Sequence, residues 1–208
     1  MSPKTTSQKK KLIDFSRIEK FHPYKTFLFF GLLGSTVVFM SITFLYFAGM
    51  AKSLPLENFN LPKPFFLSAL LLLLSSFTIS KAVDAFKEDA IKNLFGTLLV
   101  TLVLGLIVAA SQIYGWKKLF DSGFLLQTHT RVSYLYVISG IHFLHIFIGL
   151  IFLIVLTVSA YFKLNDPVKS LVYFSNEYQL TKLELVVIFW HFVDFLWLGL
   201  FLIFLFTF

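Results

Sequence analysis

The sequence predicts an all-α integral membrane protein, a bundle of five transmembrane helices. Of its 208 residues, 57% are hydrophobic and only 14% are charged, and the mean hydropathy is +0.81. The apolar residues form five long blocks, and a helix needs ~20 predominantly apolar residues to cross a bilayer. A soluble domain of this size could not bury so many apolar side chains, so the membrane class follows from composition and block length together.

A polar and basic segment, residues 1–24, precedes the membrane domain, residues 25–208. We expect this segment to be a cytoplasmic tail held near anionic lipid. We expect no cleaved signal peptide, because the segment lacks a short apolar region followed by a cleavage site. The apolar blocks place the five helices at about residues 26–51, 65–83, 94–116, 133–162 and 185–208.

The distribution of Lys and Arg predicts the orientation of the bundle. If the N-terminus is inside, the inside segments carry seven, three and three of these residues, and the outside loops carry two and three. Cytoplasmic segments of membrane proteins carry the excess of positive charge. We therefore expect a cytoplasmic N-terminus and an outside C-terminus. The same distribution accounts for the net charge of +7 without a nucleic-acid partner.

Four ionisable side chains lie well inside the predicted helices, His142 and His145 on the fourth and His191 and Asp194 on the fifth. A carboxylate near a helix centre costs about 2.5–3.5 kcal/mol on insertion scales, so it needs a partner. Consecutive helices run antiparallel, and His145 and Asp194 each lie about halfway along their helices. The hypothesis is a polar cluster in which Asp194 hydrogen-bonds one or both of His145 and His191.

Three uses of this cluster are open. Histidines are the usual axial ligands of membrane haems, but haem ligation needs facing histidines with small residues around the ring. A proton relay through Asp194 would need a second intramembrane carboxylate, and none continues the path. The residues favour a structural contact that fixes helix register, with Trp190 and Trp197 as packing anchors on the Asp194 stripe.

Other polar side chains gather at two helix ends. We interpret them as interhelical or backbone hydrogen bonds rather than as binding sites: Ser75, Ser76, Thr78 and Ser80 at one end, Ser111 and Gln112 at the other. The sequence has no Gly-rich phosphate loop and no nucleophile elbow, and the lack of cysteine excludes disulfides and thiolate metal sites. We therefore assign no catalytic, cofactor-binding or metal-ligating residue.

Two motifs lie in the last two predicted helices. Residues 139–149 read SGIHFLHIFIG, and residues 190–198 read WHFVDFLWL. Together they resemble the signature of cytochrome c oxidase subunit III, which contains a T-G-x-H-x-x-H-V-x-x-G element and ends in a W-H-F-V-D-x-x-W-L helix. The order and separation of the motifs agree, and the resemblance covers roughly residues 25–208. The five-helix length suits the short bacterial form of that family.

Two departures from the family pattern limit what the resemblance implies. Better-studied members carry a buried glutamate in the first matching helix, where this chain reads Gly34-Ser35-Thr36-Val37. The histidine pair usual after the second helix is also missing, since Ala82-Val83-Asp84 occupies that region. A proton-related role of that glutamate therefore cannot be transferred to this chain.

Within those limits, the resemblance implies an accessory, non-redox subunit of a haem–copper terminal oxidase, cytochrome c oxidase type, in a bacterial cytoplasmic (inner) membrane. Haem and copper are then expected in partner subunits, with catalytic subunit I as the neighbour and structural phospholipids between the helices. Such a subunit supports the stability and proton uptake of subunit I during oxygen reduction. The alternatives are a subunit III-like protein of a quinol oxidase or nitric-oxide reductase complex, a small proton-coupled carrier that titrates Asp194, and a lipid-organising scaffold.

Overall fold

The computed structural model describes residues 23–50, 62–126 and 129–207, and these residues contain helices and no β-strand. Five of the helices are long and apolar enough to cross a membrane, which confirms the predicted all-α fold with five spanning segments. The helices in chain order are α1 (Pro23–Met50), α2 (Lys63–Lys87), α3 (Ile91–Asp121), α4 (Thr130–Tyr161), the short α5 (Pro167–Phe174) and α6 (Glu177–Thr207).

The helices extend beyond the apolar blocks that predicted them. α2 continues to Lys87 and α3 begins at Ile91, so the polar connector expected there is a short turn in which Asp89 adopts a φ of 54°. Hydropathy marks only the part of a helix that lies in lipid, whereas Lys, Glu and Gln continue a helix readily in water. The predicted basic tail, residues 1–24, falls mostly outside the described residues, and so do the predicted helix ends at residues 51 and 208.

The connector between α4 and α6 contains α5, which the apolar blocks did not predict. The Asp166 carboxylate caps this helix by accepting hydrogen bonds from the backbone N–H groups of Val168 and Lys169, both at 3.1 Å. Pro167 occupies the first helical turn. A capping aspartate followed by proline favours a helix start. α6 then begins at Glu177 rather than at residue 185.

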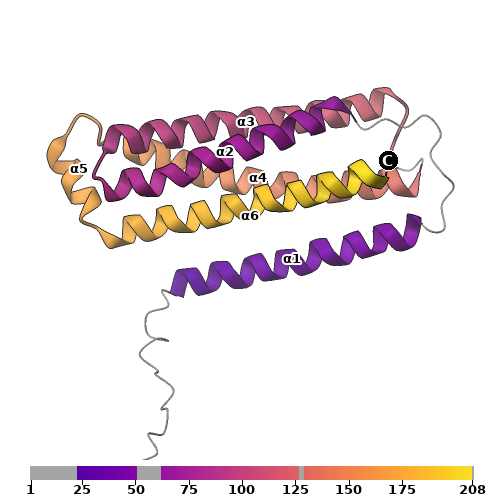
Figure 1. Ribbon diagram of the computed structural model, residues 1–208, viewed down its shortest axis with the longest axis horizontal. Coiled ribbons are helices and arrows are strands. Elements are labelled where there is room, and N and C mark those ends of the chain that lie inside the picture. The colour runs from indigo at the N-terminus through magenta and orange to yellow at the C-terminus, as the bar shows by residue number, and fades with distance from the viewer. Residues whose placement is uncertain (1–22, 51–61, 127–128, 208) are drawn as a thin grey trace, which may run out of the picture.

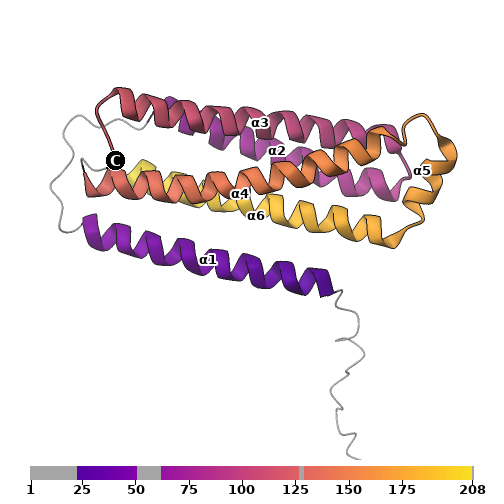
Figure 2. The same cartoon turned by 180° about the vertical axis from the view of Figure 1, so that it is seen from behind.

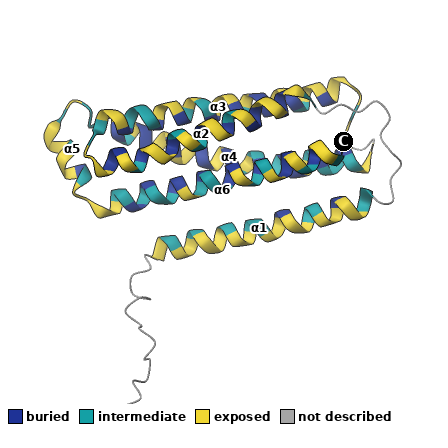
Figure 3. Ribbon diagram, viewed as in Figure 1, coloured by how far each residue is buried: buried dark blue, intermediate teal, exposed yellow. Residues whose placement is uncertain are grey.

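Four of the long helices, α2, α3, α4 and α6, pack together as a bundle, and α1 lies beside them (Figure 1). The view from behind shows the same separation (Figure 2), and α1 contacts α4 and α6. Buried residues line the centre of the four-helix bundle, whereas only Phe39 and Tyr46 of α1 are buried (Figure 3). The fold therefore has a tightly packed part and a peripheral helix.

Large apolar side chains cover the outer surface of each long helix. Examples, one from each helix in chain order, are Phe27, Phe77, Ile113, Phe147 and Phe206. In water such a surface would drive association, whereas lipid tails are as apolar as these side chains. The outer surface therefore fits a multi-pass membrane protein, and the buried polar groups are the place to look for function.

Candidate functional site

Trp190 lies at the centre of the four-helix bundle. The indole is 1% exposed, and its Nε1–H donates a hydrogen bond to the Ser75 hydroxyl on α2 at 3.1 Å. Its ring lies directly against two glycines. A Cβ added to Gly105 on α3 would approach the ring to 2.7 Å, and one added to Gly149 on α4 would approach it to 2.9 Å. We call these four residues, Ser75, Gly105, Gly149 and Trp190, the Trp190 layer.

Trp197 occupies a second position two turns further along α6. It is fully buried, and its Nε1–H donates to the Ser68 hydroxyl on α2 at 3.0 Å. The imidazole of His142 on α4 stacks on the indole, with ring centroids 4.7 Å apart and 18° between the planes. The ring of Phe65, also on α2, lies 5.8 Å from the indole.

Gln112 on α3 lies at the same level as Trp197. One turn further along α3, Trp116 Nε1–H donates to the Ser139 hydroxyl on α4 at 2.9 Å. Because α3 and α4 run antiparallel, one turn back along α3 from Trp116 and one turn forward along α4 from Ser139 lead to the same level. Gln112 and His142 are therefore aligned. The Gly115 backbone also lies against the Phe65 ring, since an added Cβ would be 3.1 Å from it. We call Ser68, Gln112, His142 and Trp197 the Trp197 layer.

The two layers repeat with a spacing of seven residues on every helix. The pairs are Ser68 and Ser75 on α2, Gly105 and Gln112 on α3, His142 and Gly149 on α4, and Trp190 and Trp197 on α6. Seven residues are about two helical turns, so each pair lies on one face of its helix. Each layer therefore takes one position from each of the four helices, with a serine on α2 accepting the indole N–H.

His145, one turn from His142 on α4, forms its side-chain hydrogen bond with α1, while its ring lies 6.4 Å from the Phe189 ring of α6. Its Nδ1 is hydrogen-bonded with the Ile141 carbonyl at 2.8 Å, and its Nε2 lies 2.9 Å from the Ser35 hydroxyl on α1. A carbonyl oxygen only accepts, so Nδ1 carries the proton, and in the neutral ring Nε2 accepts from Ser35. His145 thus connects α4 to the peripheral helix.

His191 on α6 is bound by two serines of α2. Its Nδ1 lies 2.7 Å from the Ser76 hydroxyl and its Nε2 lies 3.2 Å from the Ser80 hydroxyl. Ser80 donates its own proton to the Ser76 carbonyl at 2.9 Å, so Ser80 accepts from Nε2–H. In the neutral ring, Nδ1 then accepts from Ser76. This histidine serves the α2–α6 contact.

Asp194 is buried between the two layers, and neither carboxylate oxygen has a hydrogen-bond partner among the described residues. The expected hydrogen bond to His145 or His191 is therefore not formed, because His145 faces α1 and His191 faces α2. The Ser76 hydroxyl is beside Asp194 but outside hydrogen-bond geometry, and it is engaged with His191. That the four ionisable residues act as one structural cluster stays a prediction.

Two further buried side chains have polar atoms without a hydrogen bond in the described part of the chain. They are Gln112 and His142, both of the Trp197 layer. The Trp190 layer contains no such atom within residues 62–126 and 129–207. The described residues also contain no group of three or more His, Asp or Glu side chains that could hold a metal ion.

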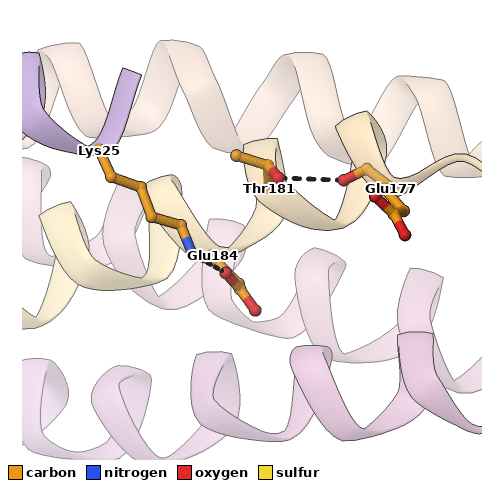
Figure 4. Close-up of polar contacts among 4 residues, drawn as sticks. All are labelled: Lys25, Glu177, Thr181 and Glu184. Carbon is orange, nitrogen blue, oxygen red and sulfur yellow. Dashed lines mark hydrogen bonds and ion pairs between the residues drawn. The ribbon is translucent and has the colours of Figure 1, made fainter. Parts of the chain in front are cut away.

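An ion pair joins the beginning of α1 to α6 (Figure 4). Lys25 Nζ lies 2.5 Å from Glu184 Oε2, and one turn earlier on α6 the Thr181 hydroxyl donates to the Glu177 carbonyl at 3.0 Å. Next to the ion pair, a cavity of about 560 Å³ separates the two helices. Apart from Lys25 and Thr26, the residues that line the cavity are apolar. They include Leu28, Phe29, Leu32, Leu185 and Ile188.

The serines at residues 75 and 76 form the interhelical bonds that the sequence suggested. Ser35, Ser68 and the two layer glycines were not singled out as site residues. The sequence contained a signal for Ser68, because Ser68 precedes Ser75 by the same seven residues that separate Trp190 from Trp197. The sequence does not say which helices face each other, so the shared spacing could not be assigned to common layers.

Comparison with known proteins places these features in a family context. A family model for cytochrome c oxidase subunit III matches residues 26–207. The cytochrome c oxidase subunit 3 of Thermostichus vulcanus is 30% identical over 135 residues, which cover 65% of this chain and 61% of that protein. The probable cytochrome c oxidase subunit 3 of Nocardia farcinica is 28% identical over 179 residues, covering 80% and 83%.

A relative named for a different electron donor is also similar. The probable quinol oxidase subunit 3 of Staphylococcus saprophyticus is 25% identical over 175 residues, which cover 84% of this chain and 80% of that protein. The family match extends over all five long helices and therefore includes both tryptophan layers.

Proposed function

The chain belongs to the cytochrome c oxidase subunit III family, and on that premise we propose that it is the accessory, non-redox subunit of a cytochrome c-type terminal oxidase. As a haem–copper oxidase subunit III, it is part of a terminal oxidase complex. The finer proposal is that it packs against catalytic subunit I and supports that subunit's stability and proton uptake during oxygen reduction.

The observation that carries this proposal is the closed centre of the bundle. Haem ligation between two helices needs facing histidines and space for a planar ring between them. In this chain the space between α4 and α6 is filled by two indoles, and His142 stacks on Trp197 instead of facing a second histidine. The residues present therefore do not fit a haem, and we place haem and copper in partner subunits.

Two histidines support the same proposal, because each is hydrogen-bonded to another helix. His145 is bonded to α1 and His191 is bonded to α2, and the Ser35 and Ser76 bonds occupy ring nitrogens that a metal would need. A side chain that holds two helices in register contributes to the shape of the subunit. That shape is what an accessory subunit presents to its neighbours.

We propose a bacterial cytoplasmic (inner) membrane as the location, with the N-terminus in the cytoplasm. The excess of Lys and Arg in residues 1–25 supports this orientation. Structural phospholipids belong to the proposal as well. The cavity beside Lys25 and Glu184, with its apolar lining and a cation at its edge, is a suitable place for an acyl chain.

A quinol oxidase is the second candidate for the parent complex, favoured by the similarity to a quinol oxidase subunit over 84% of the chain. The electron donor is bound by other subunits in either case. The fold and the two layers are therefore compatible with both complexes, and the test must be made on the assembled enzyme.

The experiment is purification of the complex in mild detergent by a tag on this chain. We expect haem-containing subunits to co-purify and oxygen consumption to follow addition of reduced cytochrome c. Oxygen consumption with a quinol alone would select the second candidate. Recovery of the chain without any haem protein, together with proton transport by the isolated chain in liposomes, would contradict the accessory-subunit proposal.

A further inference from the structure

The Trp197 layer contains four buried polar atoms without a hydrogen bond in the described part of the chain. They are Nε2 and Oε1 of Gln112 and Nδ1 and Nε2 of His142. Both side chains are fully buried. A buried amide or imidazole without partners is costly, and lipid around the bundle supplies none. Two such side chains at one level of the bundle call for a common explanation.

The neighbouring protein groups of this layer are already engaged. The Ser68 hydroxyl accepts from Trp197 Nε1–H and donates to the Phe65 carbonyl. The Ser139 hydroxyl accepts from Trp116 Nε1–H and donates to the Leu135 carbonyl. These serines and tryptophans have no proton left for Gln112 or His142, and an indole N–H is only a donor. The Asp194 carboxylate, between the two layers, is not within hydrogen-bond geometry of either side chain. No direct partner among the described residues therefore satisfies Gln112 or His142.

Comparison with the Trp190 layer narrows the explanation. There, the positions on α3 and α4 are glycines, and the indole fills the space by contact alone. In the Trp197 layer the corresponding positions carry an amide and an imidazole. Packing around an indole requires no polar atom at these positions, so the polarity of both side chains indicates a polar ligand.

The chemistry of the two side chains defines that ligand. Gln112 offers a donor and an acceptor, and a neutral imidazole offers one of each. The ligand must both donate and accept hydrogen bonds, it must be small because the layer is closed by Trp197 and Phe65, and the layer contains no charged side chain to balance an ion. A buried water typically makes about three hydrogen bonds to otherwise unpaired groups. We propose that Gln112 and His142 bind a water molecule that bridges α3 and α4.

The first test is a structure of the complete oxidase complex at a resolution that shows ordered water. The expected result is density within about 2.7–3.2 Å of a polar atom of Gln112 and of His142. A direct hydrogen bond between these two side chains, or continuous apolar contact with no density between them, would overturn the proposal. This outcome does not depend on the electron donor, so it is separate from the test of function.

The second test is a double-mutant cycle in the purified complex, which reads the coupling between the two side chains. Gln112→Leu and His142→Phe each leave the other polar group unpaired, so each should lower the temperature at which this subunit leaves the complex. The double variant removes both side chains that hold the water, so neither is left unpaired. Its release temperature should therefore fall by less than the two single decreases added together, with a difference of at least about 2–4 °C. Additive shifts would contradict the bridge.

A matched control and a milder variant keep this test informative. Ser111→Ala removes a hydroxyl next to Gln112 that bonds only its own helix, at the Val108 carbonyl, so it should leave the temperature nearly unchanged. If Gln112→Leu prevents assembly, Gln112→Met preserves the length of the side chain and repeats the cycle. The same cycle run with Ser111→Ala and His142→Phe gives the coupling expected without a shared water. A Gln112–His142 coupling no larger than this value would again count against the proposal.

Discussion

α1 and the four-helix bundle are held in different ways, although both consist of long apolar helices. In the bundle, Trp190 contacts α2, α3 and α4, Trp197 contacts α2 and α4, and each indole donates its N–H to a serine. α1 contacts its neighbours through separate polar links near its two ends and its middle: Lys25 to Glu184, Ser35 to His145 and Tyr46 to Thr207. The outward side chains of α1 are mostly exposed.

The comparison of α1 with the four-helix bundle shows which helix contacts depend on close packing. Lipid provides no hydrophobic drive between helices, so association depends on contact and on interhelical hydrogen bonds. The bundle obtains contact by placing glycines against indoles. α1 places one glycine, Gly49, against a smaller ring, that of Tyr134, where an added Cβ would be 3.3 Å away. A cavity of about 560 Å³ lies between α1 and α6. We therefore expect substitutions in the bundle to cost far more than substitutions at α1.

The largest effect is expected from filling the Trp190 layer. Gly149→Ala places a Cβ 2.9 Å from two ring atoms of Trp190, and a buried indole between two helices cannot move aside. We expect a loss of about 1–3 kcal/mol, the usual cost of overpacking, measured as a lower release temperature of the subunit from the detergent-solubilised complex.

Gly140→Ala is the matched control on the same helix, because a Cβ there meets no atom within 4 Å. It should be neutral or slightly stabilising, by up to about 1 kcal/mol, since alanine is the better helix former. Equal losses for the two variants would mean that the indole contact does not distinguish the layer from the rest of α4.

A smaller effect is expected from removing one indole N–H. Trp197→Phe loses the hydrogen bond to Ser68, but the Ser68 hydroxyl keeps its bond to the Phe65 carbonyl and is not left unpaired. Interhelical hydrogen bonds in membranes average about 0.6 kcal/mol, and loss of indole contact area adds to this. Ser68→Ala keeps the indole but leaves its buried N–H without an acceptor, so its loss should contain the hydrogen bond together with the cost of an unpaired donor.

At α1 the expected effect is smaller again and depends on salt. Lys25 and Glu184 are 41% and 29% exposed, and exposed ion pairs contribute about 0.2–1 kcal/mol. Glu184→Gln should loosen the α1–α6 contact. Because the chain has no cysteine, spin labels at Phe29 and Ile188, on the two sides of the cavity, can report the distance.

The distribution of distances between the two labels should be broader in Glu184→Gln than in the protein that keeps Glu184. In the protein that keeps Glu184, it should broaden as the salt concentration rises. The same label pair in Trp197→Phe serves as the comparison, since the bundle contact lies away from this cavity. A distribution that responds to Trp197→Phe but not to Glu184→Gln would reverse the proposed difference between the two regions.

The smallest effect is expected at α5, outside the membrane-spanning helices. The backbone N–H of Lys169, followed by its ammonium group, holds the pKa of Asp166 below its ordinary value. A lowered folded-state pKa means that the stabilisation of α5 is present above the unfolded-state pKa of about 3.9 and is lost as pH falls through the lower folded-state value. As pH falls through this range, hydrogen exchange of the first α5 amides should become faster in the protein with Asp166 than in Asp166→Asn. The asparagine cap does not titrate, so that variant corrects for the intrinsic pH dependence of exchange.

Hydropathy located the five spanning helices because lipid solvation acts on single residues and needs no knowledge of neighbours. The partners of the polar residues depend on which helices face each other, and that is not written in any single helix. His145 illustrates this, since its depth in the membrane suggested a hydrogen bond with Asp194 of the last helix, whereas the structure gives it a hydrogen bond with Ser35 of the first.

Two local features show what the sequence contained and hydropathy ignored. Asp166 followed by Pro167 is a helix-start signal, yet α5 lies in a segment too short and polar to form an apolar block. The seven-residue spacings of α2 and α6 were likewise visible. The indole–glycine contacts could not be predicted, because they require the register of α3 and α4 against α6.

The contact between Tyr46 and Thr207 sets an order for biogenesis. Tyr46 donates a hydrogen bond to the Thr207 hydroxyl at 2.6 Å, and the two residues are 161 positions apart. α1 is synthesised before α6, so this contact can form only after α6 has been translated. The helices that follow can pair with one another as they emerge. The contact of α1 with α4, through Ser35 and His145, can form earlier. The contact of α1 with the end of α6 is therefore made later than its contact with α4, and a nascent chain that stops before α6 lacks the Tyr46–Thr207 hydrogen bond.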